Sequence, residues 1–461
     1  MNRFVLLLAL LAASLGAATR PNVVVVLIDD MGWKDVGFAG NRFIETPNLD
    51  RFAQEGTRFT QCYASAPNCA PSRACLLTGQ YAPRHGVYTV VDDRYAPGQA
   101  HMRVMSTRGN DEIPDRTVTV AEALKSSGYA TALIGMWNLG RGRPGTPGSP
   151  TGQGFDLYRR PDDLGFAKDA YKDDKGRYLS DVFTDEAIAW IGKQKGRPFF
   201  LYFADHSVHE PLDPKADLLE KYRRKASSAG AAAVDPAYAA TVEAVDANFG
   251  RLMAALASMG LDRDTLVIFT SDNGGLPGLV APLRGSKGLL YEGGIRVPGA
   301  ARWPGVIPPG KSLESPVLGM DIFPTLLEAA GVARPEGQPM DGVSLLPALR
   351  AGTALASRPL FWHFPCYIGK GEPMSLMREG DYKLIQKFAG PTFELYNLRE
   401  DPSEARNLAA TEPRRLEEMK AKLAAWQKQT GAFLADQSNP AYDPKAKEPR
   451  GQRRGEVKSK K

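Results

Sequence analysis

Four apolar runs, each followed at once by polar residues, constrain the fold of this chain more than any other feature of its sequence. They read PNVVVVLIDDMG from residue 21, YATALIGMWNLG from 129, RPFFLYFADHSVHEP from 197 and DTLVIFTSDNGG from 264. Apolar runs rich in β-branched and aromatic residues are typical of strands buried on both faces of a sheet. The sequence therefore predicts four central strands.

Helical patterns alternate with these strands, at residues 46–55, 118–127, 180–193 and 235–259. Alternating strands and helices indicate an α/β fold with a largely parallel sheet. In such sheets, ligands bind beyond the carboxyl ends of the strands. We therefore expect the polar residues that follow the four strands to converge on one cleft.

Two of these strand ends carry acidic pairs that suggest a metal site. Asp29 and Asp30 follow the first strand, and Asp272 and Asn273 follow the last. Three carboxylates brought together repel one another unless a cation neutralises them, and an all-oxygen ligand set suits a hard divalent ion. The alternative is that each pair is a separate turn or helix cap. Zinc is disfavoured because the five histidines and four cysteines include no HxxxH or CxxC spacing.

The segment CAPSRACLLTG, from Cys69, has the pattern of a helix start, with Pro71 in the first turn. A helix N-terminus favours an anion, and Arg73 adds a charged fork suited to phosphate or sulfate oxygens. Cys69 could be half of a disulfide, a metal ligand, a thiolate nucleophile or a residue converted into something else. A thiolate phosphatase would place the arginine six residues after the cysteine, but here it comes four after. A cysteine protease would need a histidine and an oxyanion arrangement that the sequence does not identify.

The N-terminus predicts export. Arg3 precedes an apolar run of about 12 residues, and Gly16 and Ala18 suit a signal-peptidase site, so residues 1–18 are expected to be a signal peptide. The run is too short to span a bilayer, and we expect no transmembrane anchor. A buried N-terminal helix is the alternative. Only four cysteines occur in the 461 residues, so we expect one disulfide at most and a protein that is periplasmic or secreted.

The net charge of +6 is concentrated at the C-terminus. From Lys445 onward there are eight basic and two acidic residues, which accounts for the whole excess and leaves the body nearly neutral. We expect residues 436–461 to form a disordered basic tail, and the alternative is that this tail binds an anionic polymer or surface. No nucleic-acid partner is expected.

CAPSRACLLTG resembles the CxPSRxxxLTG signature of the type I sulfatases, in which the cysteine is oxidised after translation to formylglycine. The resemblance continues through nearly the whole mature chain, in the segments PNVVVVLIDDMGWKDVGFAG, TPNLDRFAQEGTRFTQCYASAPNC, GFDLY, LRGSKGLLYEGGIRVP, GMDIFPTLLEAAG, GDYKLI and FELYNLREDPSEARNL. It implies an alkaline-phosphatase-like α/β/α sandwich around a large, mostly parallel mixed sheet over residues 19–350. A small C-terminal α+β subdomain, an antiparallel sheet plus a helix, is expected over residues 351–435.

The resemblance also implies the site, residue by residue. Cys69 would become an aldehyde whose hydrate attacks sulfur in line, and Arg73 would stabilise that hydrate. Lys287 and His209 would contact the sulfate, and one of them would assist departure of the alcohol. Ca²⁺ would polarise the sulfuryl oxygens and lower the pKa of the nucleophile. The ligands of Ca²⁺ would be Asp29, Asp30, Asp272, Asn273 and the modified residue 69. A formylglycine-generating enzyme is then a partner during maturation.

One segment departs from the family pattern. Where the family usually reads GKWHLG, this chain reads GMWNLG, so that Met136 replaces the lysine and Asn138 the histidine. In the family mechanism, that histidine takes a proton from the hydrate so that the covalent sulfate ester collapses, whereas an amide cannot act as a base near neutral pH. A general base contributes about 10²- to 10⁴-fold. Turnover is therefore expected to be slow unless Arg141, Arg143 or His206 substitutes.

Three functions follow from the sequence. The first is a sulfuric ester hydrolase acting on a sulfated glycan or an aryl sulfate, because the modification signature, the acidic ligands and Lys287 are all present. The second is a weakened or inactive relative that binds sulfated glycans, which Met136 and Asn138 favour. The third is a phosphoester or phosphonate hydrolase on the same scaffold.

Overall fold

The computed structural model describes residues 20–140, 145–167, 170–194, 196–230, 234–275, 280–369 and 371–448. Within these residues, the larger part of the chain is built on an eight-stranded sheet with the order β5-β4-β6-β1-β7-β8-β2-β9. The five strands from β5 to β7 run parallel, and β8 is antiparallel to both of its neighbours. The strands are β1 Asn22–Ile28, β2 Thr57–Phe59, β4 Ala130–Gly135, β5 Leu157–Arg159, β6 Phe199–Asp205, β7 Thr265–Ser271, β8 Gly299–Arg302 and β9 Lys311–Leu313.

The four predicted strands are confirmed as β1, β4, β6 and β7, which are neighbours in the sheet. β1 shows why its residues form a central strand. Val23, Val25 and Leu27 pack in one hydrophobic core, and the alternate residues Val24, Val26 and Ile28 pack in a second core on the other face. Because successive side chains of a strand point to opposite faces, only an uninterrupted apolar run can fill both cores.

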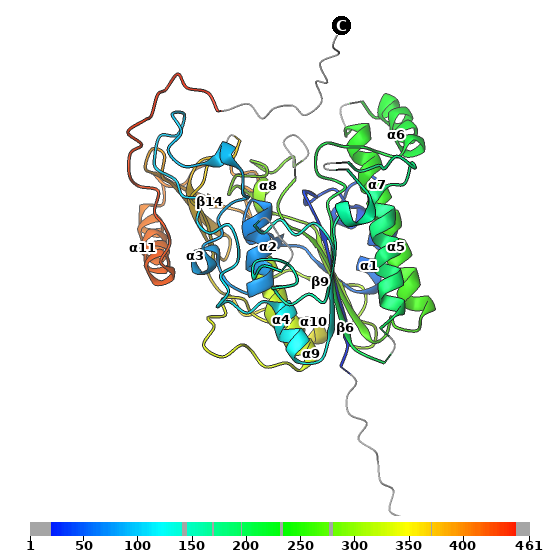
Figure 1. The fold of residues 1–461 in the computed structure, drawn as a ribbon. Helices are drawn as coiled ribbons and strands as arrows, with labels where there is room; N and C mark the ends of the chain where they lie inside the picture. The colour runs from blue at the N-terminus through cyan, green and yellow to red at the C-terminus, as the bar shows by residue number, and fades with distance from the viewer. Residues whose placement is uncertain are drawn as a thin grey trace, which may run out of the picture.

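Helices cover both faces of the sheet, which makes the α/β/α sandwich that the family resemblance implied (Figure 1). One face carries α2 Cys69–Thr78, α4 Val120–Ser126, α9 Ile322–Ala330 and α10 Leu346–Ala351. The other face carries α1 Pro47–Glu55, α5 Leu179–Gly192, α6 Ala216–Ala229 and α7 Pro236–Ser258. The four helices predicted at 46–55, 118–127, 180–193 and 235–259 correspond to α1, α4, α5 and α7.

A second, antiparallel sheet follows in the order β11-β12-β13-β14, as expected for the C-terminal part. Helix α11 packs on it, with the ring of Trp426 stacked at 4.8 Å on Phe361. Trp362 donates a hydrogen bond from Nε1 to the carbonyl of Ala64, 2.8 Å away, which joins the sheet to the larger part. The boundary at residue 350 stays a prediction. The remaining elements are β3 Cys62–Tyr63, α3 Ala82–His85, α8 Glu292–Ile295, β10 Val317–Leu318, β11 Leu360–Phe364, β12 Met374–Glu379, β13 Tyr382–Lys387, β14 Thr392–Asn397 and α11 Pro413–Thr430.

The prediction that the chain is disordered from residue 436 is wrong for residues 437–443. This segment runs back along residues 99–105, where Met105 N donates to Gln437 O at 2.8 Å and Asp443 N donates to Ala100 O at 2.8 Å. The buried amide of Asn439 donates to the carbonyls of Gln99 and Met102. Charge composition alone cannot detect such pairing, because it rests on backbone groups. Three predicted features lie outside the described residues: the signal peptide at 1–18, the residues Arg141 and Arg143, and the end of the tail at 449–461.

The cysteines Cys62, Cys69, Cys75 and Cys366 are all buried and free. No disulfide therefore stabilises the described part of the chain. Among the described helices, none is both long and apolar enough to cross a membrane.

Candidate active site

The polar residues that follow β1 and β7 come together at one edge of the sheet. The two strands are parallel neighbours with Ile28 opposite Ser271, so the residues after each strand emerge side by side. Asp272 N donates to Ile28 O at 3.2 Å, which links the two strand ends. On the other side of β1, Asp29 N donates to Asp205 O at 2.9 Å at the end of β6. The ends of β1, β6 and β7 therefore meet at one edge of the sheet, as predicted.

A cluster of possible metal ligands lies at this edge. Carboxylate oxygens of Asp29, Asp30 and Asp272 and the sulfur of Cys69 all lie within 4.8 Å of one another, and all four residues are buried. The Oδ1 of Asn273 is buried beside them without a hydrogen-bond partner among the described residues, while its amide nitrogen donates to Asp30 at 2.7 Å. An orphaned buried acceptor among carboxylates is a group that a cation would satisfy.

The turn that carries Asp30 is held in an unusual backbone conformation. Asp30 has φ +65°, in the left-handed region that few residues other than glycine adopt. After it, Met31 N donates to the hydroxyl of Ser271 at 3.1 Å, and that hydroxyl donates to Ile28 O at 2.8 Å. Tyr238 donates from its hydroxyl to Asp35 at 2.5 Å and lies 3.4 Å from the carbonyl of Asp30. Contacts from β7 and α7 thus hold the backbone of this turn.

Cys69 is the first residue of α2, as the sequence predicted, and is 2% exposed. Its thiol donates a hydrogen bond to Asp29 Oδ1 at 3.3 Å. Burial, together with the negative charge of Asp29, raises the pKa of this thiol well above its usual value. A thiolate nucleophile requires the opposite shift, so this environment does not favour a reaction at the sulfur itself.

Arg73 lies one helical turn after Cys69 and is completely buried. Its Nε donates to Asp272 at 2.9 Å, one terminal nitrogen donates to Asp29 at 3.1 Å, and the other donates to the carbonyl of Met136. The guanidinium therefore neutralises two carboxylates and ties the end of β4 to them. These contacts account for the arginine four residues after the cysteine.

The carboxylates of the cluster differ in their pKa values. Burial and the charge of Asp29 raise the pKa of Asp272 to about 7. Burial also acts on Asp29, but the positive charges of Arg73, His209 and Lys287 outweigh it and hold the pKa of Asp29 well below its usual range. A group with a pKa near neutrality resists ionisation here, so an added cation would stabilise the cluster.

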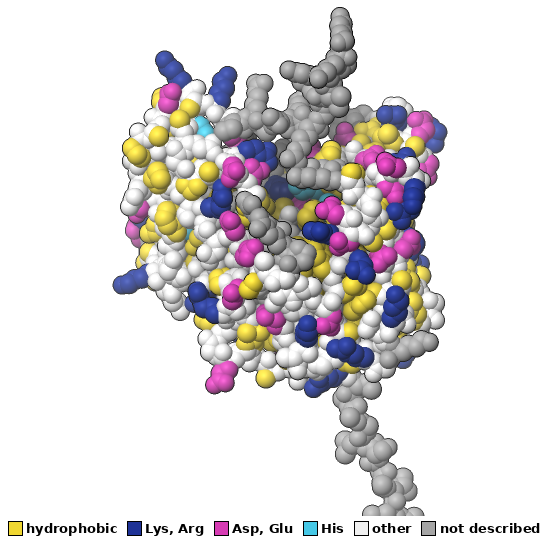
Figure 2. Space-filling model, in the orientation of Figure 1, with side chains coloured by type: hydrophobic (Ala, Val, Ile, Leu, Met, Phe, Trp, Pro, Cys, Tyr) yellow, Lys and Arg dark blue, Asp and Glu magenta, His cyan; other side chains and the backbone are white. Residues whose placement is uncertain are grey.

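Lys287 and His209 approach the cluster from its open side. The ammonium of Lys287 lies 2.7 Å from Asp30 Oδ1 and 2.9 Å from Oδ2, and its side chain is 16% exposed. His209 Nε2 lies 3.7 Å from Asp30, and this side chain is 38% exposed. Figure 2 shows histidine and basic side chains together in a hollow near the top of the face in view. These two basic side chains could therefore meet an anion that approaches the carboxylate cluster from this side.

The departure at GMWNLG lies in the same place. Asn138, with φ +56°, points its amide at Asp29 Oδ2 over 3.4 Å. Met136 contributes its carbonyl to Arg73.

His206 follows β6, and its ring is buried between Tyr171 and Phe183, at 5.3 and 5.8 Å. Burial lowers the pKa of His206 to about 4, so this ring is neutral at pH 7, and its Nδ1 has no partner among the described residues.

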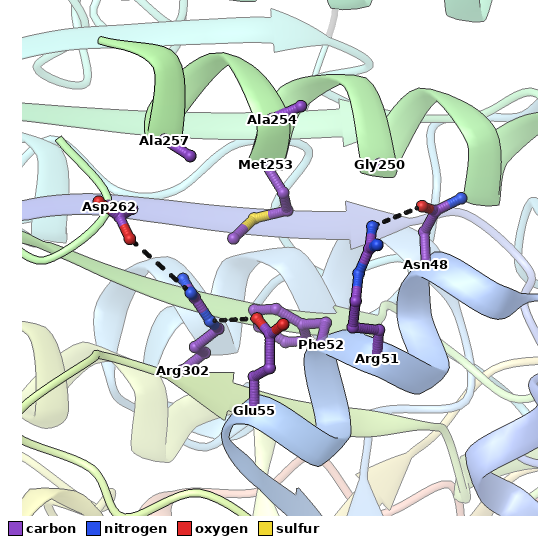
Figure 3. Close-up of a pocket in the computed structure, with 10 residues that line it drawn as sticks. All are labelled: Asn48, Arg51, Phe52, Glu55, Gly250, Met253, Ala254, Ala257, Asp262 and Arg302. Atoms are coloured by element: carbon purple, nitrogen blue, oxygen red, sulfur yellow. Dashed lines mark hydrogen bonds and ion pairs between the residues drawn. The ribbon is translucent and has the colours of Figure 1, made fainter. Parts of the chain in front are cut away.

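A separate cavity of about 240 Å³ lies between α1 and α7 and shares no residue with the cluster (Figure 3). Arg302 sits in its wall, 3.0 Å from Glu55 and 3.9 Å from Asp262. Arg51 contacts Asn48 at 3.0 Å. Arg302, one of the two arginines that line this cavity, is thus already paired with carboxylates.

Comparisons with known proteins assign the family. The family model described as "Sulfatase" matches residues 21–332, and the one described as "N-sulphoglucosamine sulphohydrolase, C-terminal" matches residues 286–429. A sulfatase from Formosa agariphila is 33% identical over 500 residues, 89% of each chain. The N-acetylgalactosamine-6-sulfatase of Canis lupus familiaris is 35% identical over 82% of this chain and 74% of its own.

A solved structure agrees with these relatives. The crystal structure of Ps i-CgsB superposes with a TM-score of 0.73 at 28% identity, covering 92% of this chain and 94% of that one. Its complex with k-i-k-neocarrahexaose gives the same TM-score at 27% identity over the same shares. The chain is therefore a sulfatase, an enzyme that hydrolyses sulfate esters, and belongs to the type I sulfatase family.

Proposed function

We propose that this enzyme removes sulfate from a sulfated carbohydrate, using a formylglycine made from Cys69 and a bound Ca²⁺. The single observation that carries the proposal is the buried cluster of Asp29, Asp30, Asp272 and Cys69 within 4.8 Å at the N-terminus of α2. The names of the relatives support a carbohydrate, since one acts on N-acetylgalactosamine 6-sulfate and Ps i-CgsB was crystallised with a neocarrahexaose. An aryl sulfate would serve as a small reporter substrate.

The donor set fits calcium. Its proposed ligands offer hard oxygen atoms, and Asn273, whose Oδ1 has no partner among the described residues, is joined to Asp30 through its amide nitrogen. When bound, the ion would polarise sulfate oxygens as a Lewis acid. The ligands would be Asp29, Asp30, Asp272, Asn273 and the modified residue 69.

The environment of residue 69 supports a converted residue. Formylglycine would supply a hydrated aldehyde as the nucleophile, which a thiol of raised pKa cannot replace. Asp29 contacts the side chain of Cys69 and is itself held by Arg73, so this pair would keep the modified side chain in one orientation. Without a formylglycine-generating enzyme in the host, we expect inactive protein.

Lys287 and His209 would bind and orient the sulfate. Lys287 is a permanently charged donor beside Asp30, and an entering sulfate oxygen would share its ammonium. His209 Nδ1 lies 2.6 Å from the carbonyl of Glu210, which can only accept a hydrogen bond, so Nδ1 carries a proton and Nε2 faces the site. When His209 is doubly protonated, Nε2 can give its proton to the departing alcohol.

Asn138 limits how quickly the cycle ends. It stands at the position of the family's basic histidine, but an amide does not accept a proton near neutral pH. His206, one of the substitutes predicted from the sequence, is neutral and has a ring nitrogen without a partner among the described residues, so it is one candidate acceptor. Slow completion of the cycle is therefore part of the proposal.

The binding-only and phosphoester alternatives have less support. Three curated relatives whose names indicate a type of substrate are all sulfatases, and each aligns with most of this chain. The proposed export after cleavage of residues 1–18 rests on the sequence alone.

The test combines two measurements on protein made in its own host. Peptide mass spectrometry of residue 69 is expected to detect the aldehyde, and 4-nitrophenyl sulfate and N-acetylgalactosamine 6-sulfate are expected to lose sulfate in a reaction that chelator suppresses. The Cys69→Ala variant is the control and should be inactive. An unmodified thiol in protein that still hydrolyses both esters would refute the formylglycine proposal.

A further inference from the structure

Lys287 lies in a loop, residues 284–292, that begins with Arg284 and ends at the first residue of α8. Within the loop, Leu289 N donates to Ser286 O at 3.0 Å, and Gly293 N closes it by donating to Arg284 O at 2.7 Å. The two backbone contacts to the larger part are Lys287 N to Gly275 O at 3.1 Å and Gly288 N to Pro67 O at 2.8 Å. Few described contacts therefore hold this loop from the catalytic side.

The C-terminal sheet holds both ends of the loop, and one residue contacts both. The carboxylate of Glu404 accepts from Glu292 N at 2.8 Å, at the C-terminal end of the loop. The backbone carbonyl of the same residue accepts from Arg284 at 3.1 Å, at the N-terminal end. Glu404 follows β14 and therefore reaches the loop from the other sheet.

Glu404 is itself held under unusual conditions. It is 1% exposed and has φ +54°, a conformation that side chains larger than glycine rarely adopt. Its carboxylate lies 2.8 Å from the ammonium of Lys383 on β13, which also contacts Glu292 at 2.9 Å. A buried, strained, charged residue persists only where its surroundings over-determine it.

Neighbouring side chains extend the attachment. Arg284 also donates to the hydroxyl of Tyr396 on β14 at 2.8 Å and lies over the ring of Tyr291 at 3.9 Å. Tyr291 donates to Glu394 at 2.7 Å, again on β14. Glu292 accepts from Tyr63 at 2.7 Å, which anchors the C-terminal end of the loop to the larger part as well. In this network, Glu404 is the residue whose carboxylate and carbonyl span the two ends.

We propose that Glu404 is a positioning residue, which fixes the 284–292 loop so that the ammonium of Lys287 stays against Asp30. That Glu404 holds the loop follows from the contacts above. That its loss lowers kcat/KM rests also on the proposed contact of Lys287 with sulfate. The C-terminal part of the chain would then contribute to the reaction indirectly. It would hold the loop that carries Lys287, without contacting the substrate.

A double-mutant cycle tests the kinetic consequence. Glu404→Gly keeps the backbone carbonyl and the left-handed φ and removes the carboxylate, and Glu404→Gln is the isosteric variant if the first is too unstable. With residue 69 modified, Glu404→Gly is expected to lower kcat/KM for 4-nitrophenyl sulfate about 10- to 100-fold, since a shift of about 1 Å at a reacting group costs on this order. When Glu404→Gly is added to Lys287→Ala, kcat/KM should fall by less than about threefold below that of Lys287→Ala alone.

The matched control is Gln427→Ala. Gln427 is buried between α11 and the C-terminal sheet, where it donates to Ser375 and Gln386, and it has no described hydrogen bond to the loop. Its replacement should lower Tm but leave kcat/KM unchanged, both alone and with Lys287→Ala. If the kcat/KM losses of Glu404→Gly and Lys287→Ala multiply in the double variant, the two residues act independently. Glu404 would then not act on the reaction through Lys287.

Hydrogen–deuterium exchange of the holoenzyme tests the holding itself, whatever Lys287 does. Amides in residues 285–293 should exchange at least about tenfold faster in Glu404→Gly than in wild type or Gln427→Ala. Unchanged exchange in this segment would overturn the proposal. If Lys287→Ala alone has full activity, the proposed sulfate contact fails and the kinetic consequence with it, while exchange still decides whether Glu404 holds the loop.

Discussion

Two buried clusters of charge lie on either side of the 284–292 loop, and they differ in how their carboxylates are compensated. At the strand ends, the carboxylates of Asp29, Asp30 and Asp272 share the cations Arg73 and Lys287. Beneath the C-terminal sheet, Glu292 and Glu404 share Lys383, and Glu292 also meets Arg296 at 3.7 Å. The first cluster has three carboxylates for two cations and is short of positive charge, whereas the second has two carboxylates for two cations. Each contains one buried oxygen without a hydrogen-bond partner among the described residues, Asn273 Oδ1 in the first and Glu404 Oε1 in the second.

This difference indicates what each cluster is for. Leaving a buried charge uncompensated is costly, so a cluster with a deficit persists where a ligand completes it. A balanced cluster needs no ligand and joins the elements that contribute its members. Substitutions in the first cluster should therefore affect metal binding and catalysis, and those in the second should affect stability.

The largest effect is expected from Asp272→Asn, which removes one carboxylate from the cluster with the deficit. Loss of the proposed ion should lower kcat/KM about a thousandfold or more, because a bound metal contributes several kcal/mol to the transition state. Calcium should raise the Tm of the wild type but not of the variant, as measured by scanning calorimetry with calcium or with chelator. A wild type whose Tm is identical in both buffers would contradict the metal site.

Lys383→Met removes the shared cation from the balanced cluster. Two buried carboxylates are then left facing each other, and we expect the free energy of unfolding to fall by about 3 to 5 kcal/mol. Urea denaturation should give the same loss with calcium and with chelator, because no ion belongs to this cluster. Lys422→Met, which breaks an exposed ion pair with Glu379, is the matched control and should change stability by less than about 1 kcal/mol. A loss that appears in calcium alone would contradict the contrast.

The double variant Met136→Lys, Asn138→His adds a cation and a base to the cluster with the deficit. Histidine tolerates the left-handed backbone of residue 138, so the change should not disturb the turn. We expect the wild type to show a burst with 4-nitrophenyl sulfate and then slow turnover, and the variant to turn over about a hundredfold faster. Stopped-flow and steady-state release of nitrophenol, with residue 69 confirmed as modified, measure both. Fast wild-type turnover without a burst would show that another group, such as His206, is the base.

The smallest effect concerns pH. Burial and the charge of Glu292 raise the pKa of Glu404 to about 7, above its ordinary value of 4.5 in an unfolded chain. A raised carboxyl pKa stabilises the fold fully below pH 4.5, and that stabilisation is lost as the pH rises through 7. Relative to Glu404→Gln, the wild type should therefore lose free energy of unfolding as the pH rises from 4.5 to 8. Urea titrations at each pH should give the same difference with calcium and with chelator, and the opposite slope would contradict the assignment.

The sequence predicts the first cluster much better than the second. Asp29, Asp30, Asp272 and Asn273 each follow an apolar strand, and parallel strands bring their carboxyl ends to one edge, so local pattern plus one rule of sheet geometry is enough. Cys69 was identifiable as a helix start from Pro71 and the apolar residues after it.

The second cluster has no such signal. Glu292 precedes Lys383 by 91 residues and Glu404 by 112. The three lie on a short helix, a strand and a loop, so no periodicity or spacing joins them. The left-handed backbone of Asp30, Asn138 and Glu404 was likewise invisible, because none of them is glycine. The pairing of residues 437–443 with 99–105 was missed for the related reason that it uses backbone groups, which every sequence has.

Cys69 is 2% exposed, behind Asp29 and at the buried start of α2. A converting enzyme has to accommodate the cysteine and its neighbours in its own cleft, and the folded chain offers it almost no surface there. If Cys69 is the residue converted, conversion must come before α2 docks against β1 and β7. The yield of active enzyme is then set by a race between modification and folding. Slower folding, as at low temperature during expression, would increase the modified fraction without any change in sequence.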